Sequence, residues 1–168
     1  VQVSDDVFPL IQVAEEYSAV PNGGFDYTVG PITNLWRIGF DDAKVPTPEE
    51  IEAVLPLVDY SKAELDEENK TVFLLEEGMQ IDLGAIAKGY IADEVVKVFK
   101  AHDVTTAIID LGGNVVVMGD SPTRDTGGFN VGIQDPFASR GTIVGSINLK
   151  NKTVVTSGIY ERFIEKDG

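Results

Sequence analysis

The chain has 168 residues, of which 43% are hydrophobic and 24% are charged, so it is long enough for one packed domain and has a globular composition. Its formal net charge of −15 argues against binding to nucleic acid or to an anionic membrane surface, because phosphate groups would be repelled. The absence of cysteine excludes disulfides, a thiol nucleophile and a cysteine-ligated zinc cluster, and no apolar run approaches the roughly 20 residues that span a bilayer.

The N-terminal part of the sequence predicts one helix followed by an irregular segment. Residues 4–19 carry apolar residues at helical spacing, including Tyr17, with Ser4 as the expected N-cap and acids in the first turn. Residues 25–40 are apolar but contain Gly30, Pro31 and Gly39. We therefore expect no regular helix there.

A second helix is expected to begin at Pro48. Thr47 and Glu50 have the spacing of a capping box, and the apolar pattern continues through residue 58 with Pro56 near the end. Beyond it, the apolar runs at about 71–75 and 79–83 flank a polar turn. They predict two paired strands.

The C-terminal half predicts one long helix and then strands. The helix is expected over 85–101, with an apolar stripe formed by Ala87, Ile91, Val95 and Val98. After it, the pattern predicts two strands about a GGN turn within 106–120, a strand at 129–136, and a hairpin about NLKNK within 141–158. Helices and antiparallel strands in blocks indicate the α+β class, and we expect a single domain over 1–168.

The junction DLGAIAKGY (82–90) is the first candidate site. Asp82 ends an expected strand, small residues follow, and Lys88 falls in the first turn of the next helix. Backbone N–H groups at a helix start have no intrahelical partner and receive anions well, so the corner suits a phosphate. A packed strand–helix junction made of small residues explains the same pattern, and the residues alone do not decide between them.

Three other segments carry weaker signals. GGFDYTVGP (23–31) combines glycines with Asp26 and a threonine, DLGGN (110–114) is first of all a turn, and TSGIYERF (156–163) places Tyr160 and Arg162 after small hydroxylated residues. An arginine beside hydroxyl groups can hold a phosphate, although an exposed ion pair is the commoner outcome. Each segment by itself also fits a purely structural loop.

Together these segments resemble the ApbE family of flavin transferases. The blocks GGFDYTVGPITNLWRIGF, IDLGAIAKGYIADEVVKVF, IIDLGGNVVVMG, VGIQDP and TSGIYERF occur in that family's order and spacing, from about Phe25 onward. The resemblance implies an α+β, ApbE-like fold with an antiparallel sheet packed against helices. It also implies a Mg²⁺-dependent enzyme that binds FAD and transfers FMN to a Ser or Thr hydroxyl of a partner redox protein, releasing AMP.

The resemblance also suggests roles for individual residues, while the catalytic residues stay unknown. Ala85 matches the position whose backbone carbonyl ligates the metal, a ligand type that Mg²⁺ accepts. Seven residues match positions in or beside the FAD cleft: Gly24, Phe25, Asp26, Asp82, Lys88, Tyr160 and Arg162.

The family pattern extends beyond both ends of this sequence. The resemblance implies further blocks after Gly168 that supply side-chain metal ligands, and a lipid-attachment cysteine before residue 1. We therefore expect an incomplete metal site and little activity from this segment alone, and a lipid-anchored full-length protein located outside the cytoplasm. Two alternatives stay open: a non-catalytic FAD-binding lipoprotein, and a pyrophosphatase that splits FAD into FMN and AMP.

Overall fold

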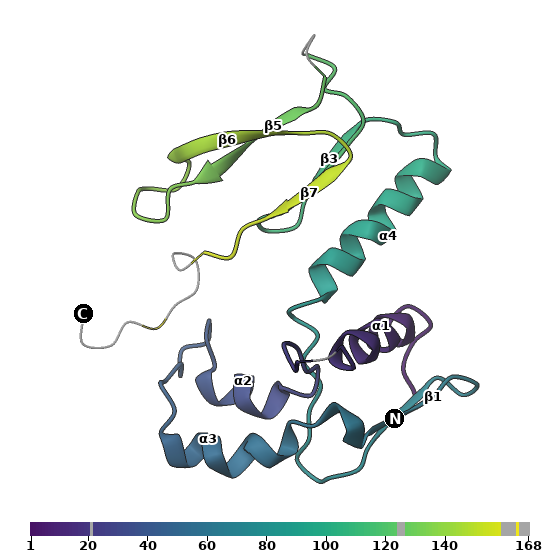
Figure 1. Cartoon of the computed structure of the whole chain (residues 1–168), viewed down its shortest axis with the longest axis vertical. Helices are drawn as coiled ribbons and strands as arrows, with labels where there is room; N and C mark the ends of the chain where they lie inside the picture. Colours follow the sequence, from purple (N-terminus) through teal and green to yellow (C-terminus); the bar gives the residue numbers. More distant parts are fainter. Residues whose placement is uncertain (21, 124–126, 159–163, 165–168) are drawn as a thin grey trace. The chain divides into compact units, whose positions relative to one another are not determined.

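The computed structural model describes residues 1–20, 22–123, 127–158 and 164 (Figure 1). The chain divides into two compact units, one of Val1–Ala87 with Ile164–Gly168, and the other of Lys88–Phe163. Helices combine with strands whose named pairings are all antiparallel, which confirms the α+β class. The expectation of a single domain over 1–168 stays a prediction.

The first unit contains helices and one strand pair. Within its described residues, no helix has the length and apolarity needed to cross a membrane, and the same holds for the described part of the second unit. The elements of the first unit are, in chain order, α1 (Phe8–Ser18), α2 (Gly30–Trp36), α3 (Pro48–Val54), the 3-10 helices η1 (Leu55–Leu57) and η2 (Tyr60–Lys62), β1 (Ala63–Asp66) and β2 (Thr71–Leu74).

Helix α1 begins later than predicted. Its N-cap is Val7, and neither a side-chain cap nor an acid in the first turn is present, so the expected cap at Ser4 is wrong. Pro9 lies in the first turn, where its missing N–H breaks no intrahelical bond. The predicted apolar stripe is also wrong at Tyr17, which is 59% exposed.

Helix α2 corrects the expectation that residues 25–40 form no regular helix. Pro31 falls in the first turn of the helix, where its fixed φ favours helix initiation. Arg37 closes the helix in the left-handed conformation with φ 47°, and Gly39 lies beyond that cap. The helix-breaking residues thus lie in the first turn of the helix or beyond its C-cap, and the rest of the helix is free of them.

Helix α3 confirms the predicted capping box. The Thr47 side chain accepts the Glu50 backbone N–H, and the Glu50 carboxylate accepts the Thr47 backbone N–H at 2.9 Å. The predicted continuation to residue 58 is wrong, because α3 ends at Val54 and the segment around Pro56 forms η1. A proline in a helix interior removes a backbone hydrogen bond and clashes with the preceding turn.

The strand pairing of the first unit differs from the prediction. Strand β2 is present, but its partner is β1, whose Ala63 stands opposite Leu74. The segment 79–83 forms no named strand; it turns toward the 27–29 segment, where Gln80 makes an isolated parallel bridge with Val29. This unexpected pairing brings two of the candidate site segments together.

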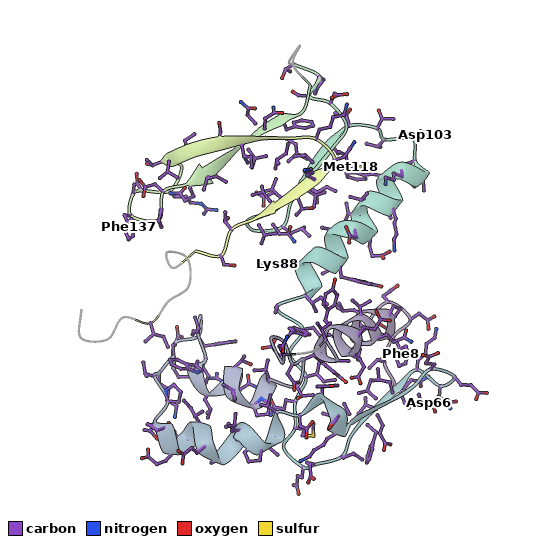
Figure 2. The ribbon with its side chains drawn as sticks, viewed as in Figure 1. Phe8, Asp66, Lys88, Asp103, Met118 and Phe137 are labelled. Carbon is purple, nitrogen blue, oxygen red and sulfur yellow. The ribbon has the colours of Figure 1, made fainter. Side chains whose placement is uncertain are left out.

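One hydrophobic cluster holds the first unit together. Ala14 of α1 and Tyr27 are fully buried, and Figure 2 locates Phe8, which is 3% exposed, on the same helix. Partly buried side chains from the site segments pack on this cluster, including Phe25 and Leu83. Burying apolar surface contributes roughly 25 cal/mol per Å². The packing of Phe25 and Leu83 on this cluster therefore stabilises the position of both site segments.

The second unit packs a helix on a sheet. Ala92 of α4 belongs to the same buried cluster as Ile109, Val116 and Met118 of the strands. Val95, Val96 and Phe99 extend this contact. Figure 2 labels Lys88 in the first turn of the helix and Asp103 just after its end. The elements are α4 (Ala87–Ala101), β3 (Ala107–Asp110), β4 (Asn114–Met118), β5 (Phe129–Gln134), β6 (Ile143–Leu149) and β7 (Lys152–Val155).

The predicted apolar stripe of this helix is only partly right. Ile91 and Val98 are 48% and 56% exposed, so the buried face is centred on Ala92 and Phe99 instead. Both sets have helical spacing, and the sequence alone does not distinguish them. The helix also begins at Ala87, two positions after the predicted start.

The strands of the second unit confirm one predicted hairpin and correct another. Strands β3 and β4 pair across the turn at 111–113, as expected. Strands β6 and β7 do not form a hairpin with each other, because β6 pairs with β5 and β7 pairs with β4. Adjacent strands in the sequence thus belong to different sheets.

Candidate functional site

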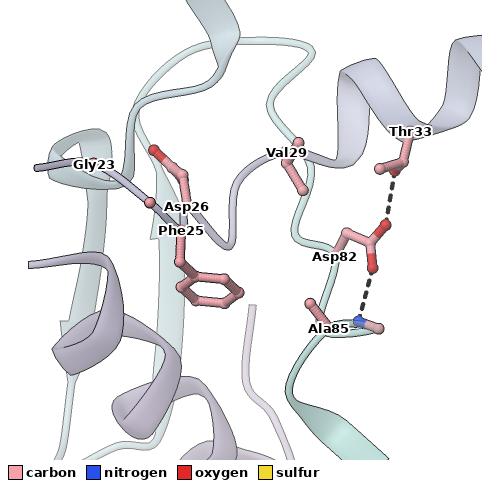
Figure 3. Close-up of a pocket in the computed structure, with 9 residues that line it drawn as sticks. Gly23, Phe25, Asp26, Val29, Thr33, Asp82 and Ala85 are labelled. Carbon is pink, nitrogen blue, oxygen red and sulfur yellow. Dashed lines mark hydrogen bonds between the residues drawn. The ribbon is translucent and has the colours of Figure 1, made fainter. Parts of the chain in front are cut away.

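The first unit contains a pocket with a volume of about 400 Å³. This lies toward the lower end of the range of roughly 300–1,000 Å³ that is typical of small-molecule sites. Figure 3 shows the side chains around it. The lining residues come from two separate segments and from α2: Gly23, Gly24, Phe25, Asp26, Val29, Thr33, Asp82, Gly84 and Ala85.

Backbone contacts join the two segments of the pocket. The Asp82 N–H donates to the Tyr27 carbonyl at 2.8 Å, next to the bridge between Val29 and Gln80. At Gly30 the approach is so close that an added Cβ would lie 2.6 Å from the Gln80 carbonyl oxygen. Glycine is therefore required at this position for the two segments to meet.

Asp26 holds the first segment in place. One of its carboxylate oxygens accepts the backbone N–H of Thr28 at 2.8 Å and the Thr28 hydroxyl at 2.6 Å, and the other accepts the Tyr60 N–H at 3.1 Å. The Thr28 hydroxyl in turn accepts the Asp59 N–H at 2.8 Å. The protein's own donors thus engage both oxygens of Asp26.

Asp82 is held differently, as Figure 3 shows. Its Oδ1 accepts the Gly84 N–H at 2.8 Å, and its Oδ2 accepts the Thr33 hydroxyl at 2.7 Å. A carboxylate offers about four lone-pair positions, so each oxygen retains capacity to accept a further hydrogen bond or to ligate a cation. Asp82 is the pocket carboxylate with the larger remaining capacity for a ligand.

Backbone donors are also available at the pocket. The N–H groups of Gly24, Phe25 and Asp26 donate to no residue in the described part of the chain. Each backbone N–H is a strong donor, so one without a protein partner can donate to an anionic or carbonyl oxygen of a ligand. The first segment therefore offers hydrogen-bond donors, while the second offers acceptors.

Tyr27 anchors the first segment in the core. Burial raises the pKa of its hydroxyl, and the neighbouring carboxylates of Glu15 and Asp26 add to the rise. Neither the Tyr27 hydroxyl nor Glu15 Oε2 has a hydrogen-bond partner within the described residues, although both atoms are buried. The segment is thus fixed in two ways: the Tyr27 side chain packs in the core, and the Asp26 carboxylate accepts hydrogen bonds from Thr28 and Tyr60.

The pocket brings together five of the eight residues predicted for the site. These are Gly24, Phe25, Asp26, Asp82 and Ala85. Lys88 is exposed in the first turn of α4, where Figure 2 labels it, and it is not among the described residues that line the pocket. Tyr160 and Arg162 lie outside the described residues, so their predicted roles stay predictions.

Sequence reasoning missed four lining residues: Gly23, Val29, Thr33 and Gly84. Gly23 and Gly84 adjoin residues that were predicted, and the motifs themselves could have suggested them. Thr33 could not be found in this way, because residues 25–40 were not expected to form the helix that points it at Asp82.

The described residues do not contain a complete metal site. No group of three or more His, Cys, Asp or Glu side chains among them could hold a metal ion. The pocket contributes the Asp82 carboxylate and the Ala85 backbone, both sources of the hard oxygen ligands that Mg²⁺ prefers. These residues fit part of a magnesium site and do not fill an octahedron by themselves.

The DLGGN motif belongs to the second unit and serves as a turn. The Asp110 carboxylate accepts the Gly113 N–H at 3.0 Å, and Gly112 and Gly113 have φ values of 64° and 90°. Positive φ at both glycines explains why the turn needs them. Asn114 begins β4 with a buried side chain.

Known proteins resemble this chain along its whole length. The model of the ApbE family matches residues 1–168. The FAD:protein FMN transferase of Klebsiella pneumoniae (strain 342) is 44% identical over 168 residues, covering 100% of this chain and 51% of that protein. That of Treponema pallidum (strain Nichols) is 36% identical over 179 residues, covering 100% and 49%.

Solved structures agree with the sequence matches. The ApbE protein of Thermotoga maritima has a TM-score of 0.85 and 33% identity, and the match covers 100% of this chain and 54% of that one. The flavin transferase ApbE of Vibrio cholerae has a TM-score of 0.75 and 26% identity, with 95% and 51% covered. The chain spans about half the length of the curated relatives it matches, and it belongs to the ApbE family.

Proposed function

We propose that the protein containing this chain transfers FMN from FAD to a Ser or Thr hydroxyl of an acceptor redox protein. The observation that carries the proposal is the pocket, which unites the GGFD and DLGA segments of a family whose relatives are named FAD:protein FMN transferases. In the reaction, the acceptor oxygen forms a bond to the FMN phosphorus. The bond from that phosphorus to the AMP phosphate oxygen breaks, and the hydroxyl proton is released.

The residues of the pocket suit different parts of FAD. The N–H groups of Gly24, Phe25 and Asp26, which have no partner among the described residues, can donate to phosphate or carbonyl oxygens of the cofactor. The Asp82 carboxylate repels a phosphate, so it accepts a hydrogen bond from a sugar hydroxyl or ring N–H, or it binds a cation. The catalytic residues remain unassigned.

The charges of the pocket favour a divalent cation. Its lining includes the two acids Asp26 and Asp82, and no Lys, Arg or His is among the nine lining residues that the structure describes. A pyrophosphate bound beside two carboxylates needs a positive charge, and we propose that Mg²⁺ supplies it, with Asp82 and the Ala85 carbonyl as ligands. When bound, Mg²⁺ stabilises negative charge on the transferring phosphoryl group.

The transfer reaction is tested directly by mass spectrometry. The intact protein is incubated with FAD, MgCl₂ and an acceptor protein, and the acceptor is analysed for covalent flavin at a Ser or Thr. We expect a flavin adduct and equimolar AMP, with both products lost when EDTA is added. A matched acceptor with Ala in place of the modified residue serves as the control.

Other outcomes identify the alternative activities. Release of FMN and AMP without an adduct would assign a pyrophosphatase, because water would then be the acceptor. Binding of FAD without cleavage would assign a non-catalytic flavin carrier. A location outside the cytoplasm and a lipid anchor on the full-length protein stay predictions.

A further inference from the structure

One face of α2 is directed at the 80–82 segment. Gly30, Thr33 and Asn34 have the i, i+3, i+4 spacing that places residues on the same side of a helix. Gly30 approaches the Gln80 backbone closely, and the Asn34 amide donates to the Gln80 side chain. The helix is therefore held in register with the residues that precede and include Asp82.

Thr33 makes the contact with the site carboxylate. Its hydroxyl lies 2.7 Å from Asp82 Oδ2 and 3.2 Å from the Gly30 carbonyl. A hydroxyl has one proton, and a charged acceptor at the shorter distance makes the stronger bond. The proton is therefore donated to Asp82.

The two donors to Asp82 act on different oxygens. The Gly84 N–H holds Oδ1, and the Thr33 hydroxyl holds Oδ2, so that rotation about the bond to the carboxylate is opposed from both sides (Figure 3). Both donors are neutral, so neither forms an ion pair with the carboxylate. A functional group held in this way loses less entropy when the ligand binds.

We propose that Thr33 is a positioning residue that presents the Asp82 carboxylate to FAD or to its bound cation. This inference rests on the proposed function of the same pocket. Thr33 acts through Asp82, so its hydroxyl matters only while the carboxylate is present. A serine at this position retains the hydroxyl, whereas a valine has nearly the same shape and lacks the donor.

The experiment measures FAD affinity in a double-mutant cycle. Thr33→Val, Thr33→Ser, Asp82→Ala and the combination of Thr33→Val with Asp82→Ala are made in the intact protein. FAD binding is followed by flavin fluorescence at fixed MgCl₂, and each variant's melting temperature is recorded. Thr153→Val, on the exposed side of β7 in the second unit, is the matched control.

We expect Thr33→Val to weaken FAD binding by roughly 5- to 10-fold, the effect of about one hydrogen bond of typical strength. Thr33→Ser is expected to bind FAD within about 3-fold of the wild type, because the donor remains. In the Asp82→Ala background, Thr33→Val should change the affinity by less than about 2-fold, because additivity fails for residues in contact. Thr153→Val should change nothing.

Several results would overturn the inference. An equal effect of Thr33→Val with and without Asp82 would show that Thr33 acts independently of the carboxylate. A loss of melting temperature with unchanged FAD affinity would assign Thr33 a purely structural role. If the wild-type protein binds FAD and Thr33→Val binds it equally, the inference alone fails; if the wild-type protein binds no FAD, the proposed function fails and the inference fails with it.

Discussion

The two carboxylates of the pocket differ in the number of hydrogen bonds that they accept from the rest of the protein. In the 23–28 region, Asp26 accepts hydrogen bonds from Thr28 and Tyr60 through both oxygens. In the 82–85 region, Asp82 receives one donor on each oxygen. Two acids in similar glycine-containing motifs thus differ in what they have left for a ligand: Asp26 braces a loop, and Asp82 is available to a ligand.

Two residues that line the same pocket can therefore have different roles, one in stability and the other in ligand binding. Asp26 lines the same cavity as Asp82, but its carboxylate already accepts three hydrogen bonds from Thr28 and Tyr60. The 23–28 region should therefore respond to substitution through stability, and the 82–85 region through ligand affinity.

Asp26→Ala should give the largest loss of stability. It removes the acceptor of two backbone N–H groups and one hydroxyl, and leaving such part-buried donors unpaired costs about 2–4 kcal/mol in total. Urea unfolding measures the change in free energy. Asp41→Ala, in an exposed loop, is the control; equal stability of the two variants would remove the distinction between Asp26 and Asp82.

Gly30→Ala should destabilise the protein by forcing α2 away from the backbone of Gln80. Its Cβ would lie 2.6 Å from a backbone oxygen of Gln80, and overpacking of this kind costs roughly 1–3 kcal/mol. Gly89→Ala is a matched control in α4, since no atom lies within 4 Å of the added Cβ. There we expect a gain of about 0.5–1 kcal/mol from lower chain entropy. The same sign for both changes in thermal unfolding would contradict this account.

Asp82→Ala should weaken FAD binding by about tenfold or more, with a loss of unfolding free energy below about 1 kcal/mol. The hydrogen bonds that the carboxylate accepts from Thr33 and Gly84 are exposed to solvent. Their loss should therefore change the free energy of unfolding little. Flavin fluorescence titration and urea unfolding of the same samples separate the two quantities. A loss of stability as large as that of Asp26→Ala would show that Asp82 is also a brace.

Tyr27→Phe tests the anchoring of the 23–28 region at high pH. Burial raises the pKa of Tyr27 in the folded protein. Above pH about 10 the unfolded chain ionises this hydroxyl while the folded chain keeps its proton, so the free energy of unfolding falls with rising pH by at most about 1.4 kcal/mol per unit. Below that pH the contribution is fully present.

Tyr27→Phe should remove the part of the fall in unfolding free energy at high pH that comes from this hydroxyl. Unfolding by urea at pH values from neutral to above 10 measures the slope for wild type and Tyr27→Phe. Tyr17→Phe replaces an exposed tyrosine and should leave the slope unchanged. Identical slopes in all three proteins would mean that Tyr27 is not the buried group responsible.

Several local features of the fold follow directly from the order of the amino acids. The capping box of Thr47 and Glu50, the turn about Gly112 and Gly113, and the family motifs depend on residues close together in the chain, where side-chain chemistry acts directly. The α+β class followed from the same local patterns. Five of the eight predicted site residues, the GGFD and DLGA contributions, also meet in one pocket.

The contacts between distant segments could not be predicted from such local patterns. Residues 79–83 leave the expected strand pair to bridge Val29, and α2 forms with Gly30 and Pro31, which argued against it, in its first turn. The pairing of β6 with β5, instead of with β7, has the same origin. Such choices depend on burial and on hydrogen bonds between segments far apart in sequence, which no short pattern encodes. Thr33 meets Asp82 for that reason.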